Sequence, residues 1–230
     1  MDILAPIETR RDDTPLASPA GIDPLDLSTI ASTLKSIVNE MGDVLARSAH
    51  STIVREAMDL ATCLADAEGR VVAQAELNPI HLNSTATALR EAYRKLDIGS
   101  IGPDDALITN NPYEMGQHLN DFILFVPVFC AGRRVGWSGT ICHHLDIGGG
   151  IAGANANATE LFHEGLVIPM MRIDMARDLC GGPFERFLAA NLRLPDPVMG
   201  DFRAQQAAAL RGRALLQAVI ARYGDNRVER

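Results

Sequence analysis

Histidine and aspartate side chains flank two apolar segments of the sequence, and together these residue types could bind a divalent metal ion. They are His118, Asp121, His143 and His144. The first two precede the apolar residues 122–129, and the other two follow residues 134–142. A tight turn at Ala131-Gly132 joins the segments, so we expect them to pair as antiparallel strands about 4.8 Å apart. The start of the first strand then lies beside the end of the second. Two imidazoles and a carboxylate there predict a metal site with open coordination positions. Polar side chains that satisfy one another at a loop-rich edge are the other interpretation.

Only one of the two adjacent histidines is expected to join this site. Neighbours on a strand point to opposite faces of the sheet, so His143 and His144 diverge if the strand continues. The start of the turn is uncertain by one residue, so strand parity does not decide between them. The same geometry makes a direct Cys142–His143 catalytic pair a poor interpretation.

A glycine-rich segment, DIGGGIAG, begins at Asp146. It lacks the GK[ST] ending of a phosphate-binding loop and does not match a dinucleotide-binding glycine pattern. A close-packed loop that lines the site is the better interpretation, because glycine lets the backbone approach a ligand closely. The candidate substrate-binding residues in this region are His144, Gly148, Gly149 and Asn155.

Further acids and a histidine lie outside these strands. Glu56 and Asp59 follow the first expected helix, where they are either a solvated helix end or an additional ligand or acid near the metal. Glu76 and His81 bracket a proline loop and could line a site. Asp146 and Glu56 are the candidates for moving a proton during catalysis.

The composition sets limits on the class of protein. The chain has 230 residues, of which 47% are hydrophobic and 22% charged, as in ordinary globular proteins. Its 21 Lys and Arg against 29 Asp and Glu give a net charge of −8, which argues against a nucleic-acid-binding protein. No apolar run is long enough to span a membrane, and the N-terminus does not read as a signal peptide. We therefore expect a cytoplasmic protein with free cysteines and no membrane partner.

Hydrophobic periodicity predicts the elements that must position the candidate residues. The expected helices cover residues 30–45 (capped by Asp26 or Ser28), 84–96, 159–165, 183–194 and 197–223, and the expected strands cover 62–65, 71–74, 105–109, 122–129 and 134–142. These elements predict an α+β fold, with a mixed, mostly antiparallel sheet, an N-terminal helix and C-terminal helices. Residues 1–22 are expected to be a flexible arm and residues 23–230 the folded domain. The last helix is unusually apolar, so it either packs on its own domain or forms a subunit interface.

Four blocks of the sequence, in this order and spacing, resemble the hydantoinase B/oxoprolinase family. They are DLATCLADAEGRVVAQAELNPIHLNS, ITNNPYEMGQHLNDFILFVPVF, HHLDIGGG and NLRLPDPVMGDFRAQQAA. The resemblance extends from about residue 23 to residue 224. Several long blocks in a fixed order are far more specific than any single motif.

The resemblance implies a partner and a ligand set. ATP and magnesium bind to a separate A-type subunit, which activates the substrate carbonyl by phosphorylation, whereas the B-type subunit holds a divalent metal. In the related ketone carboxylases the ligands are a His-x-x-Asp pair and a later histidine. These positions correspond here to His118, Asp121 and, by spacing, His143, with Glu56 as a nearby carboxylate by similarity. The ligand types leave zinc, manganese and iron open.

B-type chains are usually more than twice as long as this sequence, which matches only their N-terminal half. The partners implied are therefore an A-type subunit and, if the B-type subunit is split, a second half-length B-type chain.

The function implied is that of a metal-binding subunit of an ATP-dependent amidohydrolase. The substrate would be a small cyclic amide such as a hydantoin, an oxoproline or a lactam. The metal would lower the pKa of a bound water, and the resulting hydroxide would attack the activated carbon and open the ring. A ketone carboxylase subunit and a non-catalytic structural or assembly half-subunit are the two alternatives.

Overall fold

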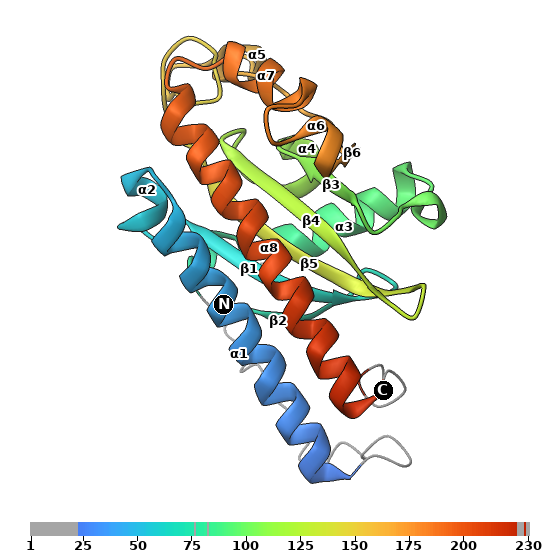
Figure 1. The fold of residues 1–230 in the computed structure, drawn as a ribbon. Helices are drawn as coiled ribbons and strands as arrows, with labels where there is room; N and C mark the ends of the chain where they lie inside the picture. Colours follow the sequence, from blue (N-terminus) through green and yellow to red (C-terminus); the bar gives the residue numbers. More distant parts are fainter. Residues whose placement is uncertain (1–22, 76, 82, 225–227, 229–230) are drawn as a thin grey trace, which may run out of the picture.

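A six-stranded antiparallel sheet forms the centre of the molecule (Figure 1). This computed structural model describes residues 23–75, 77–81, 83–224 and 228, and the arm expected over residues 1–22 lies outside them. The strands are β1 (Leu60–Asp66), β2 (Val71–Gln74), β3 (Asp105–Thr109), β4 (Asp121–Cys130), β5 (Arg133–His143) and β6 (Met171–Asp174). Their order in the sheet is β2-β1-β5-β4-β3-β6, and each neighbouring pair is antiparallel. The α+β class expected from the sequence is confirmed.

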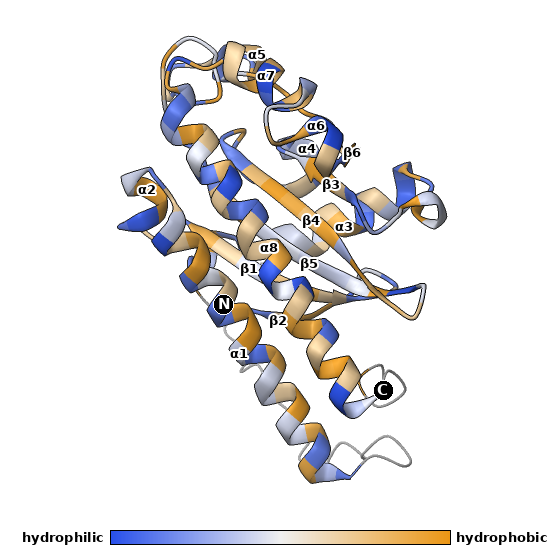
Figure 2. Cartoon of the chain, in the orientation of Figure 1, coloured by the Kyte–Doolittle hydropathy of each residue, from blue (hydrophilic) through white to orange (hydrophobic). Residues whose placement is uncertain are grey.

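The central hairpin of β4 and β5 fixes the register on which the candidate site depends. Its turn is Ala131-Gly132, where both residues have positive φ, 49° and 78°, and a glycine adopts this conformation without steric cost. From this turn the register runs back to a pairing of Asp121 with His143. Strand β4 is apolar along its length (Figure 2), as expected of a central strand covered on both faces.

Two long helices lie side by side across one face of the sheet (Figure 1). They are α1 (Pro24–Ser48) and α8 (Pro195–Tyr223). Helix α1 starts earlier than expected, because Asp23 accepts a hydrogen bond from the Leu25 N–H at 2.9 Å and Pro24 occupies the first helical position. The two helices approach closely at Gly212, where an added Cβ would overlap the side chains of Met41 and Ser138.

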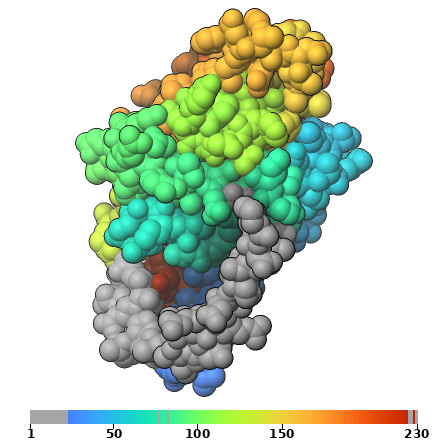
Figure 3. Space-filling view, turned by 180° about the vertical axis from the view of Figure 1, so that it is seen from behind, coloured from blue at the N-terminus to red at the C-terminus, as the bar shows by residue number. Residues whose placement is uncertain are grey.

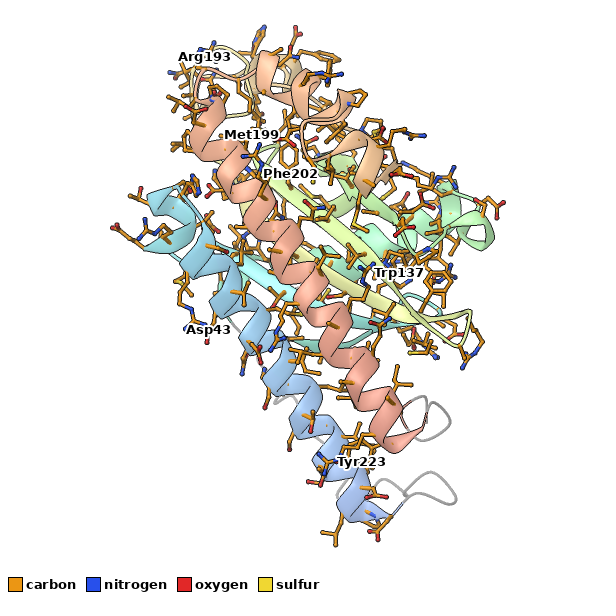
Figure 4. All side chains as sticks on the ribbon, in the orientation of Figure 1. Asp43, Trp137, Arg193, Met199, Phe202 and Tyr223 are labelled. Carbon is orange, nitrogen blue, oxygen red and sulfur yellow. The ribbon has the colours of Figure 1, made fainter. Side chains whose placement is uncertain are left out.

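The remaining helices cover the other face and one end of the sheet. They are α2 (Thr52–Arg55), α3 (Ser84–Lys95), α4 (Pro112–Met115), α5 (Leu161–Glu164), α6 (Met175–Asp178) and α7 (Pro183–Ala190), with 3-10 turns at Pro79–His81 and Ile98–Ser100. Helix α3 packs on the face opposite α1 and α8, where Ala88, Leu89 and Ala92 join a core that includes Phe125 and Trp137 (Figure 4 labels Trp137). No helix within the described ranges is both long and apolar enough to cross a membrane.

The many apolar residues of helix α8 are buried within its own domain. Its buried residues pack against α1, β4 and β5 of the same chain, among them Phe202, Ala209 and Leu216. Packing on its own domain, one of the two interpretations drawn from the sequence, therefore explains its composition without a subunit interface. The helix expected over residues 159–165 is a single turn, α5, and the one expected over 183–194 ends at Ala190.

Candidate metal centre

His118, Asp121 and His143 converge at the end of the β4–β5 hairpin. Asp121 is the first residue of β4 and is fully buried, and it pairs in register with His143, the last residue of β5. Asp121 Oδ1 lies 2.8 Å from His143 Nδ1, and Asp121 Oδ2 lies 3.4 Å from His118 Nδ1. One possible ligand atom from each of the three residues lies within 4.8 Å of the others. We call these residues the triad.

The turn after α4 brings His118 over the strand end. Helix α4 stops at Gly116, whose φ of 75° reverses the chain. The His118 N–H then donates to Asp121 Oδ2 at 2.9 Å, and the Asp121 N–H donates to the His118 carbonyl at 3.0 Å. These two bonds fix His118 while its side chain stays 56% exposed, so the triad opens to solvent on this side.

The donor set fits a divalent transition metal. Two imidazole nitrogens and a carboxylate oxygen suit zinc, manganese or iron, and three protein ligands leave coordination positions free for other molecules. Asp121 also hydrogen-bonds the imidazole of His143, the kind of contact that fixes the tautomer of a ligating histidine.

The sheet register separates the two adjacent histidines. His143 shares the edge with Asp121, whereas His144 turns to the opposite face, beneath α8. There His144 Nε2 lies 2.8 Å from Gln205 Oε1, and its ring packs on Phe122 with the centroids 4.7 Å apart. His144 has no exposed surface, so direct contact with a substrate, as expected from the sequence, does not fit its position.

Burial affects the pKa values of the two histidines in different ways. Burial disfavours protonation of His143, but its hydrogen bond to Asp121 and the negative charges of Asp121 and Asp59 outweigh this, and its pKa is raised. For His144 burial dominates, and its pKa is lowered. His144 is therefore a neutral, packed side chain at neutral pH, whereas His143 carries a proton more readily than a free histidine.

A second polar cluster, at the residue that precedes strand β1 and the loop that follows β2, supports His143. The Asp59 carbonyl accepts the His143 N–H at 3.0 Å. The carboxylate of Asp59 accepts hydrogen bonds from His81 Nε2 at 2.8 Å and from Asn78 Nδ2 at 2.6 Å. The hydrogen bond from His81 is the main cause that lowers the pKa of Asp59, against the effect of burial. A negative charge thus persists beside the triad.

Asp59 and His81 were separate candidates in the sequence, which gave no sign that they form one cluster. They meet because the β1–β2 hairpin, in which Cys63 pairs with Gln74, returns the loop after β2 to the start of β1. The pairing of Leu60 with Cys142 in the β1–β5 ladder then places Asp59 beside His143. Glu76, the other candidate residue of this loop, lies outside the described residues.

The two residues expected to move protons do not join the triad. Glu56 is exposed at the end of α2, where it lines a surface cavity with Asp43, Arg47 and Arg55 (Figure 4 labels Asp43). Asp146 is fully buried, and its oxygens accept three backbone N–H groups, from Gly148 at 2.9 Å, Arg193 at 2.5 Å and Leu194 at 2.9 Å.

Asp146 therefore ties the glycine-rich loop to the start of α8, close to Arg193 (Figure 4). A carboxylate whose lone pairs are occupied in this way is a structural anchor, so the proton-moving role expected of it does not fit.

The glycines of the loop are required by packing. Gly148 and Gly149 have φ of 85° and 76°, and an added Cβ would lie 2.8 Å from the Asn191 carbonyl and 2.5 Å from the Glu164 backbone, respectively. Asn155 is half-buried and accepts a hydrogen bond from the Asn157 N–H at 3.2 Å. The close-packed loop predicted from the sequence fits these positions, and substrate contact by these three residues stays a prediction.

The fold and the candidate site together define a class of protein: an antiparallel sheet covered by helices, with a His-Asp-His triad at the end of its central hairpin. The chain belongs to the hydantoinase B/oxoprolinase family, whose model matches residues 23–230. The resemblance described from the sequence is thereby confirmed.

Named relatives and solved structures agree with this membership. A 5-oxoprolinase of Pestalotiopsis fici is 35% identical over 85% of this chain and 16% of its own length. The beta chain of the caprolactamase of Pseudomonas jessenii is 31% identical over 90% of this chain and 36% of its own length. The crystal structure of the ATP-dependent caprolactamase from that organism superposes with a TM-score of 0.80 at 30% identity, covering 90% of this chain and 36% of that one. A nucleotide-free acetone carboxylase shares the fold, with a TM-score of 0.78 at 21% identity, covering 90% of this chain and 28% of that one.

The chain spans about a third or less of the length of the relatives named here. An uncharacterized protein of Methanocaldococcus jannaschii, 33% identical over 90% of this chain, is covered over 37% of its own length.

Proposed function

We propose that this chain is the metal-binding part of a B-type subunit in an ATP-dependent enzyme that opens a cyclic amide. The observation that carries the proposal is the triad, which unites His118, Asp121 and His143 in a fold whose relatives include a caprolactamase subunit, a hydantoinase subunit and a 5-oxoprolinase. The caprolactamase and hydantoinase relatives are each named as one subunit of their enzyme. This supports an A-type partner, to which we assign ATP and magnesium.

His118, Asp121 and His143 would hold the metal. A divalent zinc, manganese or iron ion bound by them would supply Lewis-acid chemistry to an amide carbonyl that ATP has activated. Asp121 has two tasks, since it contributes an oxygen and also orients the His143 imidazole through their 2.8 Å hydrogen bond. Asp59 holds the His143 backbone from the neighbouring strand, and its negative charge stabilises a cation in this position. His118 is the exposed member and faces the side from which a substrate can approach.

Metal content tests the binding role. The full chain, stripped with a chelator and reloaded with Zn²⁺ or Mn²⁺, is expected to bind one equivalent by elemental analysis and calorimetry. His118→Ala should reduce the affinity by at least about tenfold, in line with the loss of a metal ligand. His163→Ala is the matched control, because His163 is an exposed histidine outside the triad. Equal metal binding by both variants would contradict the assignment.

Turnover by the complex tests the reaction. The chain is co-expressed with an A-type subunit and the remaining B-type sequence, and ATP hydrolysis is followed with hydantoin, 5-oxoproline, caprolactam and acetone. Stimulation by a cyclic amide supports the amidohydrolase, and stimulation by acetone alone supports the ketone carboxylase. A complex that assembles without metal and hydrolyses no ATP with any of them supports the structural half-subunit instead.

A further inference from the structure

A cavity of about 370 Å³ lies directly beside the triad. One wall is α4 with the turn that follows it, and the other is the segment 158–164. Its polar lining consists of Tyr113, Gln117, His118, Thr159, Glu160 and Glu164. Seen from behind, the light-green surface around residues 112–120 borders the yellow-orange surface of the 150–165 segment at one end of the molecule (Figure 3). The volume falls in the range of small-molecule pockets, and His118 belongs to both the triad and the cavity.

Backbone hydrogen bonds hold the second wall in place. The Gly150 N–H donates to the His163 carbonyl at 3.0 Å, and the Leu166 N–H donates to the Ile147 carbonyl at 2.9 Å. The buried Asn110 side chain donates to the Leu166 carbonyl at 2.8 Å. These bonds tie the segment that forms the second wall to the glycine-rich loop and to the end of β3.

The lining offers acceptors but few donors. No lysine or arginine lines the cavity, and neither Glu160 nor Glu164 has a side-chain ion pair within the part of the chain that the structure describes. The Gln117 amide donates to the Ile80 carbonyl, and the Thr159 hydroxyl lies 3.3 Å from His163 Nδ1. The groups left for a ligand are thus the two carboxylates, the half-exposed imidazole of His118, and the ring and hydroxyl of Tyr113, which is 85% exposed.

We propose that this cavity receives the ring of the substrate and selects an uncharged cyclic amide or ureide over one that carries a carboxylate. Ring N–H groups can donate to Glu160 and Glu164, whereas a ligand carboxylate would meet these two like charges in a lining that offers no lysine or arginine. The inference rests on the proposed function and narrows its substrate class to neutral rings such as hydantoins and simple lactams. Glu160 and Glu164 are its specificity-determining residues.

A matched pair of ligands tests the selection. 2-Pyrrolidone and 5-oxoproline have the same five-membered lactam ring and differ in one carboxylate. Binding to the full chain is measured by calorimetry and ligand-observed NMR, in chelator-treated protein so that no carboxylate–metal contact contributes. 2-Pyrrolidone and hydantoin are expected to bind at least about tenfold more tightly than 5-oxoproline, as close like charges predict.

Two variants connect the selection to the named residues. In the double variant that combines Glu160→Gln and Glu164→Gln, the affinity for 5-oxoproline is expected to rise to within about threefold of the affinity for 2-pyrrolidone. Hydantoin binding should remain. Glu68→Gln, an exposed glutamate of the β1–β2 turn, is the control and should keep the wild-type ratio. Circular dichroism checks that the variants fold.

Three results would overturn the inference: equal binding of 2-pyrrolidone and 5-oxoproline by the wild type, no binding of either neutral ring, or an unchanged ratio in the double variant. Metal binding and ATP turnover are measured independently, so failure of the cavity assignment and failure of the proposed function are distinguishable.

Discussion

Asp121 is the residue on which the candidate site depends most directly. It is fully buried, and its two oxygens face His143 and His118 at 2.8 and 3.4 Å. The contact between Asp121 and His143 opposes metal binding, because the raised pKa of His143 favours a proton on the imidazole that would bind the metal. Metal binding therefore competes with protons, and its apparent affinity falls as the pH drops through this raised pKa.

The same pKa shift predicts a pH-dependent stability. A histidine whose pKa is raised on folding stabilises the native state below its unfolded value of about 6.5, and this contribution is lost as the pH rises through the folded value. We expect Asp121→Asn to destabilise the metal-free protein more at pH 5.5 than at pH 8.5. Urea denaturation at both pH values measures the free energies of unfolding. A difference between wild type and variant that does not change with pH would contradict this origin of the shift.

The sequence predicted the residue types of the site, but it predicted only some of the contacts between them. The turn at Ala131-Gly132 and the apolar strands were enough to predict that His118, Asp121 and a histidine meet at one edge. The choice between His143 and His144 needed the register to the residue. The Asp59–His81 hydrogen bond depends on the course of the loop that follows the β1–β2 hairpin. The contact of Asp59 with His143 depends on the pairing of β1 with β5, which leaves no local pattern in either segment.

At the scale of elements, Asp146 joins the glycine-rich loop to the first turn of α8. Replacing it by alanine would leave three backbone N–H groups without their acceptor, of which the Gly148 N–H is buried. We expect Asp146→Ala to lower the free energy of unfolding by about 2–4 kcal/mol and to leave metal stoichiometry unchanged. Chemical denaturation together with elemental analysis checks both. A stable variant that had lost only turnover would return Asp146 to the catalytic role inferred from the sequence.

The contact between α1, α8 and the sheet provides a second test at this scale. A side chain at Gly212 would meet Met41 and Ser138, which leaves no space for it. Gly212→Val should therefore destabilise the protein by about 1–3 kcal/mol in denaturant unfolding. Ala207→Val places the same side chain at an exposed position of α8 and should change stability by less than about 1 kcal/mol. Equal effects of both substitutions would show that helix propensity, not packing, decides the outcome.

Most strands and the longer helices were the most predictable part of the fold. Strand β3 and helix α3 lie where the pattern of apolar residues placed them, to within a residue. Short elements were missed: α2, α4 and α6 have four residues each, too few to show a helical period, and β6 pairs with β3 at the sheet edge with only two of its four residues apolar. The helix expected over residues 159–165 is a single turn, because Glu160 is extended, with φ of −142° and ψ of 149°, and Gly165 leaves the helical conformation with a φ of 148°.

For the molecule as a whole, a metal bound by the triad would link the turn after α4 to β4 and β5. A ligand that binds only the native state stabilises it by about 2.7 kcal/mol at a concentration of 100 times its dissociation constant. For a chain of this length we expect Zn²⁺ or Mn²⁺ to raise the melting temperature by roughly 5–11 °C. His118→Ala should abolish this increase in differential scanning fluorimetry, and His163→Ala should retain it. An increase of the same size in both variants would place the stabilising ion elsewhere.

Helix α8 runs from one end of the molecule to the other. Its 29 residues span about 43 Å, and its first turns adjoin the triad through Asp146 and Gln205. The first turn of α1 and the last turn of α8 both lie at the opposite end of the molecule (Figure 1). A protein anchored on a sensor chip at the end of α8 would thus present its histidine edge to the flowing solution, an orientation suited to testing whether the proposed A-type subunit binds there.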